Sequence, residues 1–221
     1  MKRSEHSSVK VGGRPSPLSV KQLEEVERAM APYTSSLLEK VLISTKGDVD
    51  KTSTLRSLEK TNFFTDSLDE ALLSGEIDVA VHSAKDLADP LPDGLEIVAL
   101  TEGVDPRDAL VFHEGESFWT LPKAAIIATS SSRREELVKK LRDDFRFRDI
   151  RGTIQERLDF LKKGYADGVV IALAALIRLD LLHLPHMILE GESTPLQGKL
   201  AIVARKGDVE MKEFFHPLDT R

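Results

Sequence analysis

Four segments of the chain share one pattern, in which a strand-like run ends at a hydroxyl residue and a cation, and a helix is expected to begin. The segments are residues 13–17 (GRPSP), 82–86 (HSAKD), 129–135 (TSSSRRE) and 151–157 (RGTIQER). The first turn of a helix presents free N–H groups and the positive end of the helix dipole, which together attract anions. Arginine adds a planar fork of donors that suits carboxylates. The pattern predicts a ligand that carries several carboxylates or phosphates.

Local signals support a helix start in three of these segments. Ser16 suits the N-cap position and Pro17 the first helical position. A capping box pairs a hydroxyl residue with a carboxylate residue three positions later, each side chain bonding to the other residue's backbone N–H. This spacing occurs at Ser132 with Glu135 and at Thr153 with Glu156.

Each segment also has a purely structural interpretation. A capped helix start needs no ligand, so a single segment favours a structural role, whereas four segments that carry cations favour a binding site. Asp86 can act as an N-terminal helix residue that the dipole stabilises. His82 is interpreted as a packed histidine at a strand end, and Phe63-Phe64 as core residues.

Hydrophobic periodicity predicts alternating strands and helices, and hence an α/β fold with parallel sheets covered on both faces. The segment 47–62 is polar and aperiodic and is expected to form a mobile loop. The chain is expected to cross between domains near 100–106 and 190–197. Helices are predicted over 17–30, 65–74 and 132–142 and from 157; strands are predicted over 41–45, 77–81, 95–100, 108–112, 124–129, 168–173 and 199–204.

Composition excludes several classes of function. A net charge of −6 without a basic stripe makes nucleic acid and anionic membranes poor partners, and no apolar run is long enough to span a bilayer. The chain has no cysteine, which excludes disulfides and thiolate chemistry. No metal site is expected, because the six histidines lack ligand spacing; His183 and His186 are interpreted as loop residues. The polar N-terminus holds no signal-peptide core, so a cytoplasmic location is expected.

Five motifs in order carry a resemblance to a known family. The central one is DEALLSGEIDVAVHSAKDLADPLPDGLEI at 69–97, which is followed by DPRDALV at 105–111. The others are GGRPSPLSVKQ at 12–22, ATSSSRREEL at 128–137, RGTIQERLDFL at 151–161 and LQGKLAIVARKGD at 196–208. Together they resemble the porphobilinogen deaminases, also called hydroxymethylbilane synthases.

The resemblance implies a pair of domains that resemble type II periplasmic binding proteins, each with a central sheet covered by helices and with a ligand cleft between them. The expected first domain comprises residues 1–101 plus 195–221, and the second comprises 102–194. The family's third domain, which bears a cysteine, is expected to be absent.

The resemblance also implies a reaction, the head-to-tail joining of porphobilinogen units to hydroxymethylbilane with release of ammonia, in tetrapyrrole biosynthesis. Asp86 matches the family's catalytic carboxylate, which would stabilise positive charge on the pyrrole intermediates. The residues that match its carboxylate-binding set are Arg14, Ser16, Lys85, Ser131, Arg133, Arg134, Arg151 and Arg157.

The chain departs from the family in two respects that bear on function. The family usually has threonine where Gly13 stands. It also holds a dipyrromethane cofactor through a cysteine thioether, so this chain is expected to hold dipyrromethane only non-covalently, if at all. Two alternatives stay open: a binding protein for porphobilinogen or another polycarboxylate that lacks turnover, and one part of a complex in which a protein partner replaces the third domain.

Overall fold

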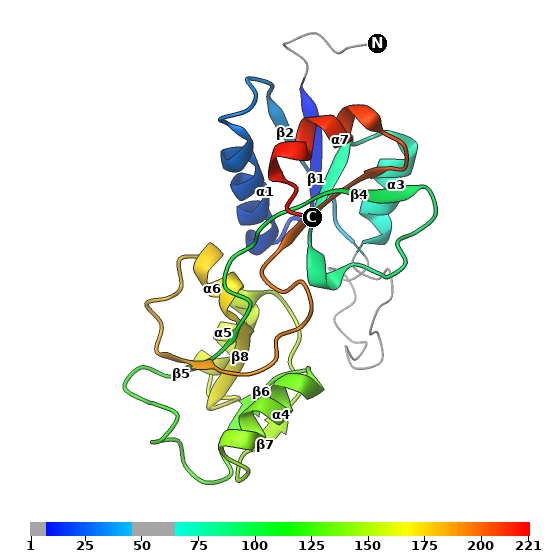
Figure 1. Cartoon of the computed structure of the whole chain (residues 1–221). Helices are drawn as coiled ribbons and strands as arrows, with labels where there is room; N and C mark the ends of the chain where they lie inside the picture. The colour runs from blue at the N-terminus through cyan, green and yellow to red at the C-terminus, as the bar shows by residue number, and fades with distance from the viewer. Residues whose placement is uncertain (1–7, 46–64) are drawn as a thin grey trace. The chain divides into compact units, whose positions relative to one another are not determined.

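The computed structural model describes residues 8–45 and 65–221. Of these, residues 8–45, 65–103 and 199–221 form one compact unit and residues 104–198 form a second. Each unit is built on a five-stranded sheet with helices packed against it (Figure 1). The α/β class predicted from the alternation of strands and helices is confirmed. The expected loop at 47–62 and the pair Phe63-Phe64 lie outside the described residues.

The first unit has the strand order β2-β1-β3-β10-β4. Its strands are β1 (Val9–Gly13), β2 (Leu38–Leu42), β3 (Val79–Ser83), β4 (Leu95–Leu100) and β10 (Leu200–Arg205). Its helices are α1 (Pro17–Met30), α3 (Asp66–Ser74) and α7 (Val209–Phe215), with single 3-10 turns η3 (Ala84–Asp86) and η4 (His216–Leu218).

Side chains on the central strands point alternately to the two faces of this sheet, and each set packs in its own apolar layer. Val79 and Val81 of β3 pack in one cluster with residues of α1 and α7, including Leu23 and Phe215. Ala80, on the opposite face of β3, packs in a second cluster with residues of α3. Because side chains alternate across a strand, α1 and α7 cover one face and α3 covers the other (Figure 1). These layers fix the carboxyl end of β3, where the candidate site residues lie.

The second unit has the strand order β7-β6-β8-β5-β9. Its strands are β5 (Asp108–Phe112), β6 (Ile126–Ala128), β7 (Arg146–Arg148), β8 (Gly168–Ala172) and β9 (His186–Leu189). Its helices are α4 (Ser132–Leu141), α5 (Ile154–Lys162) and α6 (Leu173–Arg178). Leu110, Ile127 and Val170 of the three central strands pack with Val138 of α4 in one buried cluster.

The expectation of parallel sheets is wrong for one strand in each unit. β10 runs antiparallel to both neighbours, β3 and β4, and β5 runs antiparallel to both β8 and β9. Each of these two is the first strand after the chain passes from one unit to the other. Such a strand enters its sheet without the helical crossover that a parallel pair needs, so it is free to run in the opposite direction.

Two predicted strands are displaced along the sequence. The strand expected over 41–45 is β2 at Leu38–Leu42, an edge strand that tolerates the exposed Glu39 and Lys40. The strand expected over 77–81 is β3, which begins at Val79 and extends through His82 and Ser83, both paired with β10. In both cases polar side chains interrupt the hydrophobic pattern, although the backbones of these residues pair with neighbouring strands of the sheet.

Gly198 lies where the last segment of the second unit meets its first. Its backbone has a φ of +90°, and its carbonyl oxygen accepts hydrogen bonds from Val104 N at 3.2 Å and from Arg178 Nη2 at 2.8 Å. A Cβ at this position would overlap the carbonyl oxygen of Val104. Only glycine permits both this left-handed backbone and this close approach.

We expect Gly198→Ala to lower the free energy of unfolding by about 2–4 kcal/mol, from left-handed strain plus overlap with Val104. Gly207→Ala is the matched control, because Gly207 has a φ of +79° and open space where a Cβ would lie. That control should cost only about 1 kcal/mol. Urea denaturation of both variants makes the comparison, and equal losses would show that the contact with Val104 is unimportant.

Candidate functional site

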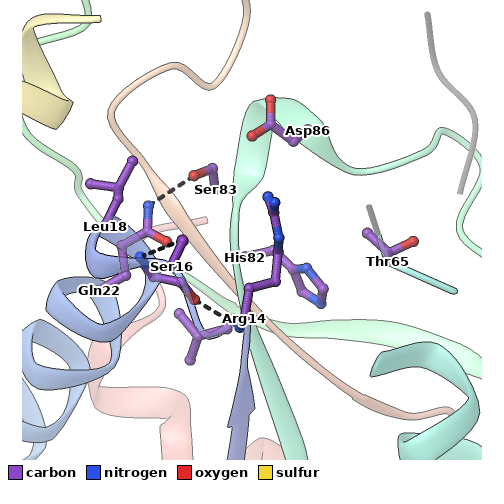
Figure 2. A pocket seen from close by; sticks show the side chains of 10 residues that line it. Arg14, Ser16, Leu18, Gln22, Thr65, His82, Ser83 and Asp86 are labelled. Carbon is purple, nitrogen blue, oxygen red and sulfur yellow. Dashed lines mark hydrogen bonds between the residues drawn. The ribbon is translucent and has the colours of Figure 1, made fainter. Parts of the chain in front are cut away.

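A pocket of the first unit lies where α1 begins and β3 ends (Figure 2). Its volume is about 90 Å³. The lining residues are Arg14, Ser16, Leu18, Ser19, Gln22, Thr65, Val81, His82, Ser83 and Asp86.

The start of α1 confirms the expected cap. Ser16 is the N-cap, Pro17 is the first helical residue, and Ser16 Oγ accepts a hydrogen bond from Ser19 N at 3.3 Å. One turn into the helix, Ser19 Oγ accepts from the backbone N–H of Arg14 at 2.9 Å. A Cβ on Gly13 would lie 3.1 Å from Ser19 Oγ, so the missing side chain leaves room for this contact. These contacts hold Arg14 and Ser16 at the N-terminus of the helix.

The segment that follows β3 does not begin a helix, contrary to the prediction. Ala84–Asp86 form one 3-10 turn, and Asp86 is its last residue rather than a member of a first helical turn. The chain then extends from Leu87, so no helix dipole stabilises the carboxylate. Asp86 is exposed, and within the described residues its carboxylate makes no hydrogen bond or ion pair. Lys85 precedes it in the same turn.

His82 lies at the base of the pocket with 7% of its surface exposed, as expected of a packed histidine at a strand end. Burial, and secondarily the charge of Arg14, lower the pKa of His82 to about 4. The imidazole is therefore neutral near pH 7 and adds no positive charge to the pocket. Its Nε2 atom is buried and has no hydrogen-bond partner.

In the second unit, the helix start at 131–135 differs from the expected capping box. Ser131, not Ser132, is the N-cap of α4, and its side chain makes no capping hydrogen bond. With Ser131 as N-cap, the third helical residue is Arg134, so no carboxylate stands where a box needs one. The Glu135 carboxylate instead lies 2.8 Å from Lys139 Nζ, one helical turn further on.

Arg133 and Arg134 both bind a carboxylate of the chain itself, that of Asp108. Arg134 donates to Asp108 Oδ1 from Nε at 3.0 Å and from Nη2 at 2.7 Å. Arg133 Nη2 donates to Asp108 Oδ2. Gln197 Nε2 donates a fourth hydrogen bond, to Oδ1, at 3.0 Å. Asp108 is only 1% exposed, so this carboxylate is a fully enclosed counter-ion.

Burial alone would raise the pKa of Asp108, but the charges and hydrogen bonds of Arg134 and Arg133 outweigh it and lower that pKa. A lowered folded-state pKa stabilises the fold at every pH above the ordinary carboxyl range. That stabilisation is lost as the pH falls through the lowered value. The two guanidinium charges and one carboxylate leave the cluster with a single net positive charge.

The start of α5 contains the expected capping box. Thr153 Oγ1 accepts from Glu156 N at 3.3 Å, and Glu156 Oε2 accepts from Thr153 N at 2.8 Å. Arg157 Nε donates to the carbonyl of Gly152 at 2.9 Å, and Arg151 precedes that glycine. The predicted cations Arg151 and Arg157 therefore flank one capped helix start.

Ser130 joins this helix start to that of α4. Its Oγ donates to Ile150 O at 2.6 Å and accepts from Ile150 N at 2.8 Å. The structure thus brings the predicted second-unit residues to two adjoining turns, one holding Ser131, Arg133 and Arg134 and the other holding Arg151 and Arg157.

Sequence reasoning missed several polar residues of these sites. Ser19 and Gln22 follow Ser16 at intervals of three, which is one helical face, so that spacing could have revealed them. Asp108 was visible as a charged residue at the head of an apolar strand. No local signal identifies Gln197, because its partner Asp108 lies 89 residues earlier.

Residues 8–45 and 65–221 contain no group of three or more His, Cys, Asp or Glu residues placed to hold a metal ion. In the same ranges, no helix combines the length and apolar character needed to cross a bilayer.

Comparison with protein families identifies the chain. Residues 9–213 match the model described as "Porphobilinogen deaminase, dipyromethane cofactor binding domain". The chain belongs to the porphobilinogen deaminase family. This confirms the resemblance carried by the motifs and, at the level of the family, the predicted transferase function in tetrapyrrole biosynthesis. The description of the matched model also supports the expected dipyrromethane cofactor.

Curated relatives share this family. The chain is 43% identical over 195 residues to "Porphobilinogen deaminase" of Caldicellulosiruptor saccharolyticus, with 88% of this chain and 67% of that protein covered. It is 40% identical over 199 residues to "Probable porphobilinogen deaminase" of Chlamydia trachomatis serovar D, with 90% of this chain and 82% of that protein covered.

Solved structures confirm the predicted fold of the porphobilinogen deaminase domains. The methionine-binding protein MetQ aligns with a TM-score of 0.60 at 16% identity, covering 96% of this chain and 89% of that protein. An ancestral arginine-binding protein aligns with a TM-score of 0.53 at 17% identity, covering 97% and 92%. The fold is that of type II periplasmic binding proteins.

We expect Asp108→Asn to lower the free energy of unfolding at pH 7 by about 3–5 kcal/mol, because two largely buried guanidiniums lose their counter-charge. The loss should shrink as the pH falls through the lowered pKa of Asp108, since the wild-type carboxylate then becomes neutral too. Asp144→Asn, which breaks the more exposed pair with Arg142, is the control and should cost much less. Urea denaturation at several pH values measures both, and equal, pH-independent losses would contradict the role of Asp108 as a buried counter-ion.

Proposed function

We propose that these residues bind porphobilinogen and join it head to tail with release of ammonia, with Asp86 as the catalytic carboxylate. The observation that carries the proposal is the composition of the first-unit pocket. It combines a cation, Arg14, and several hydroxyls with a carboxylate, Asp86, that has no partner within the described residues. A site for a plain carboxylate gains nothing from a nearby negative charge, so the pairing favours a ligand that carries both signs.

Porphobilinogen matches this composition group by group. It has acetate and propionate arms, which suit Arg14 and the hydroxyl donors around it. It also has an aminomethyl group and a pyrrole N–H, which suit the exposed carboxylate of Asp86. Arg14 and Asp86 line the same pocket, so one porphobilinogen can meet both a cation and a carboxylate there.

The role proposed for Asp86 follows from charge. Loss of ammonia from the aminomethyl group leaves a cationic pyrrole, and attack by a second pyrrole produces another cation before a proton is lost. A fixed carboxylate stabilises both positive charges and can receive that proton. A neutral His82 leaves the negative charge of Asp86 for the ligand.

We propose that the cations of the second unit also bind carboxylates. Arg133 is held by Thr194 Oγ1, Glu192 O and Asp108, which take three of its five N–H bonds and leave two for a ligand. Arg151, Arg157 and Ser131 stand at the two adjoining helix starts, where anions are favoured. Lys85, beside Asp86, is proposed to bind another arm. For Arg134, two bonds to Asp108 make orientation of that carboxylate the larger part of its role.

The same donor set fits dipyrromethane, the cofactor named in the matched family model. Dipyrromethane is a pair of linked pyrroles with carboxylate arms. The arms need cations and hydroxyls, and the pyrrole N–H groups need a carboxylate. The predicted residues include all three kinds of group. When bound, dipyrromethane supplies the primer on which the product chain is built. We propose that these residues hold it by charge-assisted hydrogen bonds, each contributing about 1.5–3 kcal/mol.

The function is tested by mass and turnover together. Protein purified from cells that make porphobilinogen is weighed under native and denaturing conditions, and then assayed for uroporphyrin formation from porphobilinogen. We expect a native mass excess equal to dipyrromethane or a bilane that is lost on denaturation, together with turnover. A bare polypeptide mass with no turnover, even after addition of hydroxymethylbilane as primer, would contradict the proposal and favour a protein that binds porphobilinogen without reaction.

Asp86→Asn should reduce turnover by a factor of about 10³, in the range found when one electrostatic stabiliser is removed. Porphobilinogen affinity should be unchanged or higher, because the arms bind elsewhere. Asp93→Asn, which changes an exposed carboxylate on the loop after η3, is the control and should keep wild-type turnover. Steady-state kinetics and calorimetric titration separate the two effects, and weaker binding with intact turnover would assign Asp86 a binding role instead.

A further inference from the structure

Three serine hydroxyls line the first-unit pocket, and each accepts a hydrogen bond from an N–H group. Ser19 Oγ accepts from Arg14 N at 2.9 Å, and Ser16 Oγ accepts from Ser19 N at 3.3 Å. Ser83 Oγ accepts from the amide Nε2 of Gln22 at 2.8 Å (Figure 2). None of the three O–H protons is donated to an acceptor within the described residues.

For two of these hydroxyls the direction of the bond is fixed by chemistry. A backbone N–H can only donate, so the oxygens of Ser16 and Ser19 must accept, and their own protons are left to donate elsewhere. An O–H donor beside a guanidinium suits an anion, because both offer hydrogen to the same kind of oxygen. Ser16 and Ser19 are therefore donors toward whatever binds beside Arg14.

The Ser83 hydroxyl accepts no hydrogen bond from a backbone N–H. The side-chain amide of Gln22 donates to it instead. Gln22 is 4% exposed and reaches from α1 to the last residue of β3. With its amide nitrogen toward Ser83 Oγ, it gives this hydroxyl the same donor direction as the other two. Its buried position, within an apolar helix face that includes Leu23 and Val26, prevents the amide from moving aside.

We propose that Gln22 is a positioning residue that fixes the Ser83 hydroxyl as a hydrogen-bond donor to the ligand carboxylate bound beside Arg14. This inference rests on the proposed function, because it takes the ligand to be porphobilinogen. Gln22 also lines the pocket, and in this inference its effect on binding passes through Ser83. An unrestrained hydroxyl would lose part of its contribution, since it could equally point its lone pairs at the carboxylate.

A double-mutant cycle tests the coupling, with porphobilinogen as the probe in calorimetric titration. We expect Ser83→Ala to weaken binding about tenfold and Gln22→Met, which keeps the side-chain volume, about fivefold, from the loss of one charge-assisted hydrogen bond or of its direction. In the Ser83→Ala background, Gln22→Met should have no further effect. The same fivefold loss in both backgrounds would overturn the inference, because Gln22 would then act without Ser83.

Two further variants keep the outcome decisive. Gln22→Asn retains an amide one methylene shorter and should give the same coupled loss, which covers the case in which Gln22→Met does not fold. Arg14→Gln reports on the proposed function itself. Reduced binding in Arg14→Gln together with independent effects of Gln22 and Ser83 would reject the inference alone. Binding unchanged in both Arg14→Gln and Ser83→Ala would reject the proposed function and the inference with it.

Discussion

A carboxylate sealed from water must be neutralised by its surroundings, and the second unit is organised around that constraint at Asp108. Removing such an ion from water costs several kcal/mol, so the fold needs the partners that neutralise it. Arg133 and Arg134 come from the start of α4, and Gln197 comes from the last residues of the unit. One side chain at the head of β5 therefore ties together a helix start and the segment that leads back to the first unit.

In the first unit, by contrast, the carboxylate of Asp86 is neither buried nor paired within the described residues. Asp86 stands at the end of a single 3-10 turn, exposed, with no ion pair among the described residues, although Arg14 lines the same pocket. An exposed carboxylate keeps its hydration and costs little, so it remains available to a ligand. The two units thus separate two uses of negative charge. At Asp108 it holds the fold together, and at Asp86 we propose that it serves chemistry.

Much of the fold was predictable, because hydrophobic periodicity survives in long, regular elements. Leu23, Val26 and Met30 lie at helical spacing after the cap at Ser16, and α1 extends over the predicted residues. Predictions failed where polar residues belong to a buried ladder, as at His82 and Ser83, and where two serines compete for one cap, as at Ser131 and Ser132.

The polar contacts of the candidate site were less accessible to prediction. The pairing of Asp108 with Gln197 and that of Gln22 with Ser83 join residues 89 and 61 positions apart. Such pairs depend on how β5, α1 and β3 pack, and no local pattern records them. The motifs located Arg14 and Asp86, whereas the groups that hydrogen-bond to the hydroxyls around them became evident only from the structure.

The absence of a side chain at Gly13 has an evolutionary consequence. A side chain at this position would place its Cβ 3.1 Å from Ser19 Oγ and 2.8 Å from Leu23 Cδ1. A side chain on the strand and a hydroxyl residue on the helix therefore compete for one volume beside the backbone N–H of Arg14. The two positions should covary among relatives, with a larger residue at 13 accompanied by a smaller one at 19. A substitution that is tolerated in one lineage would then be disruptive in another.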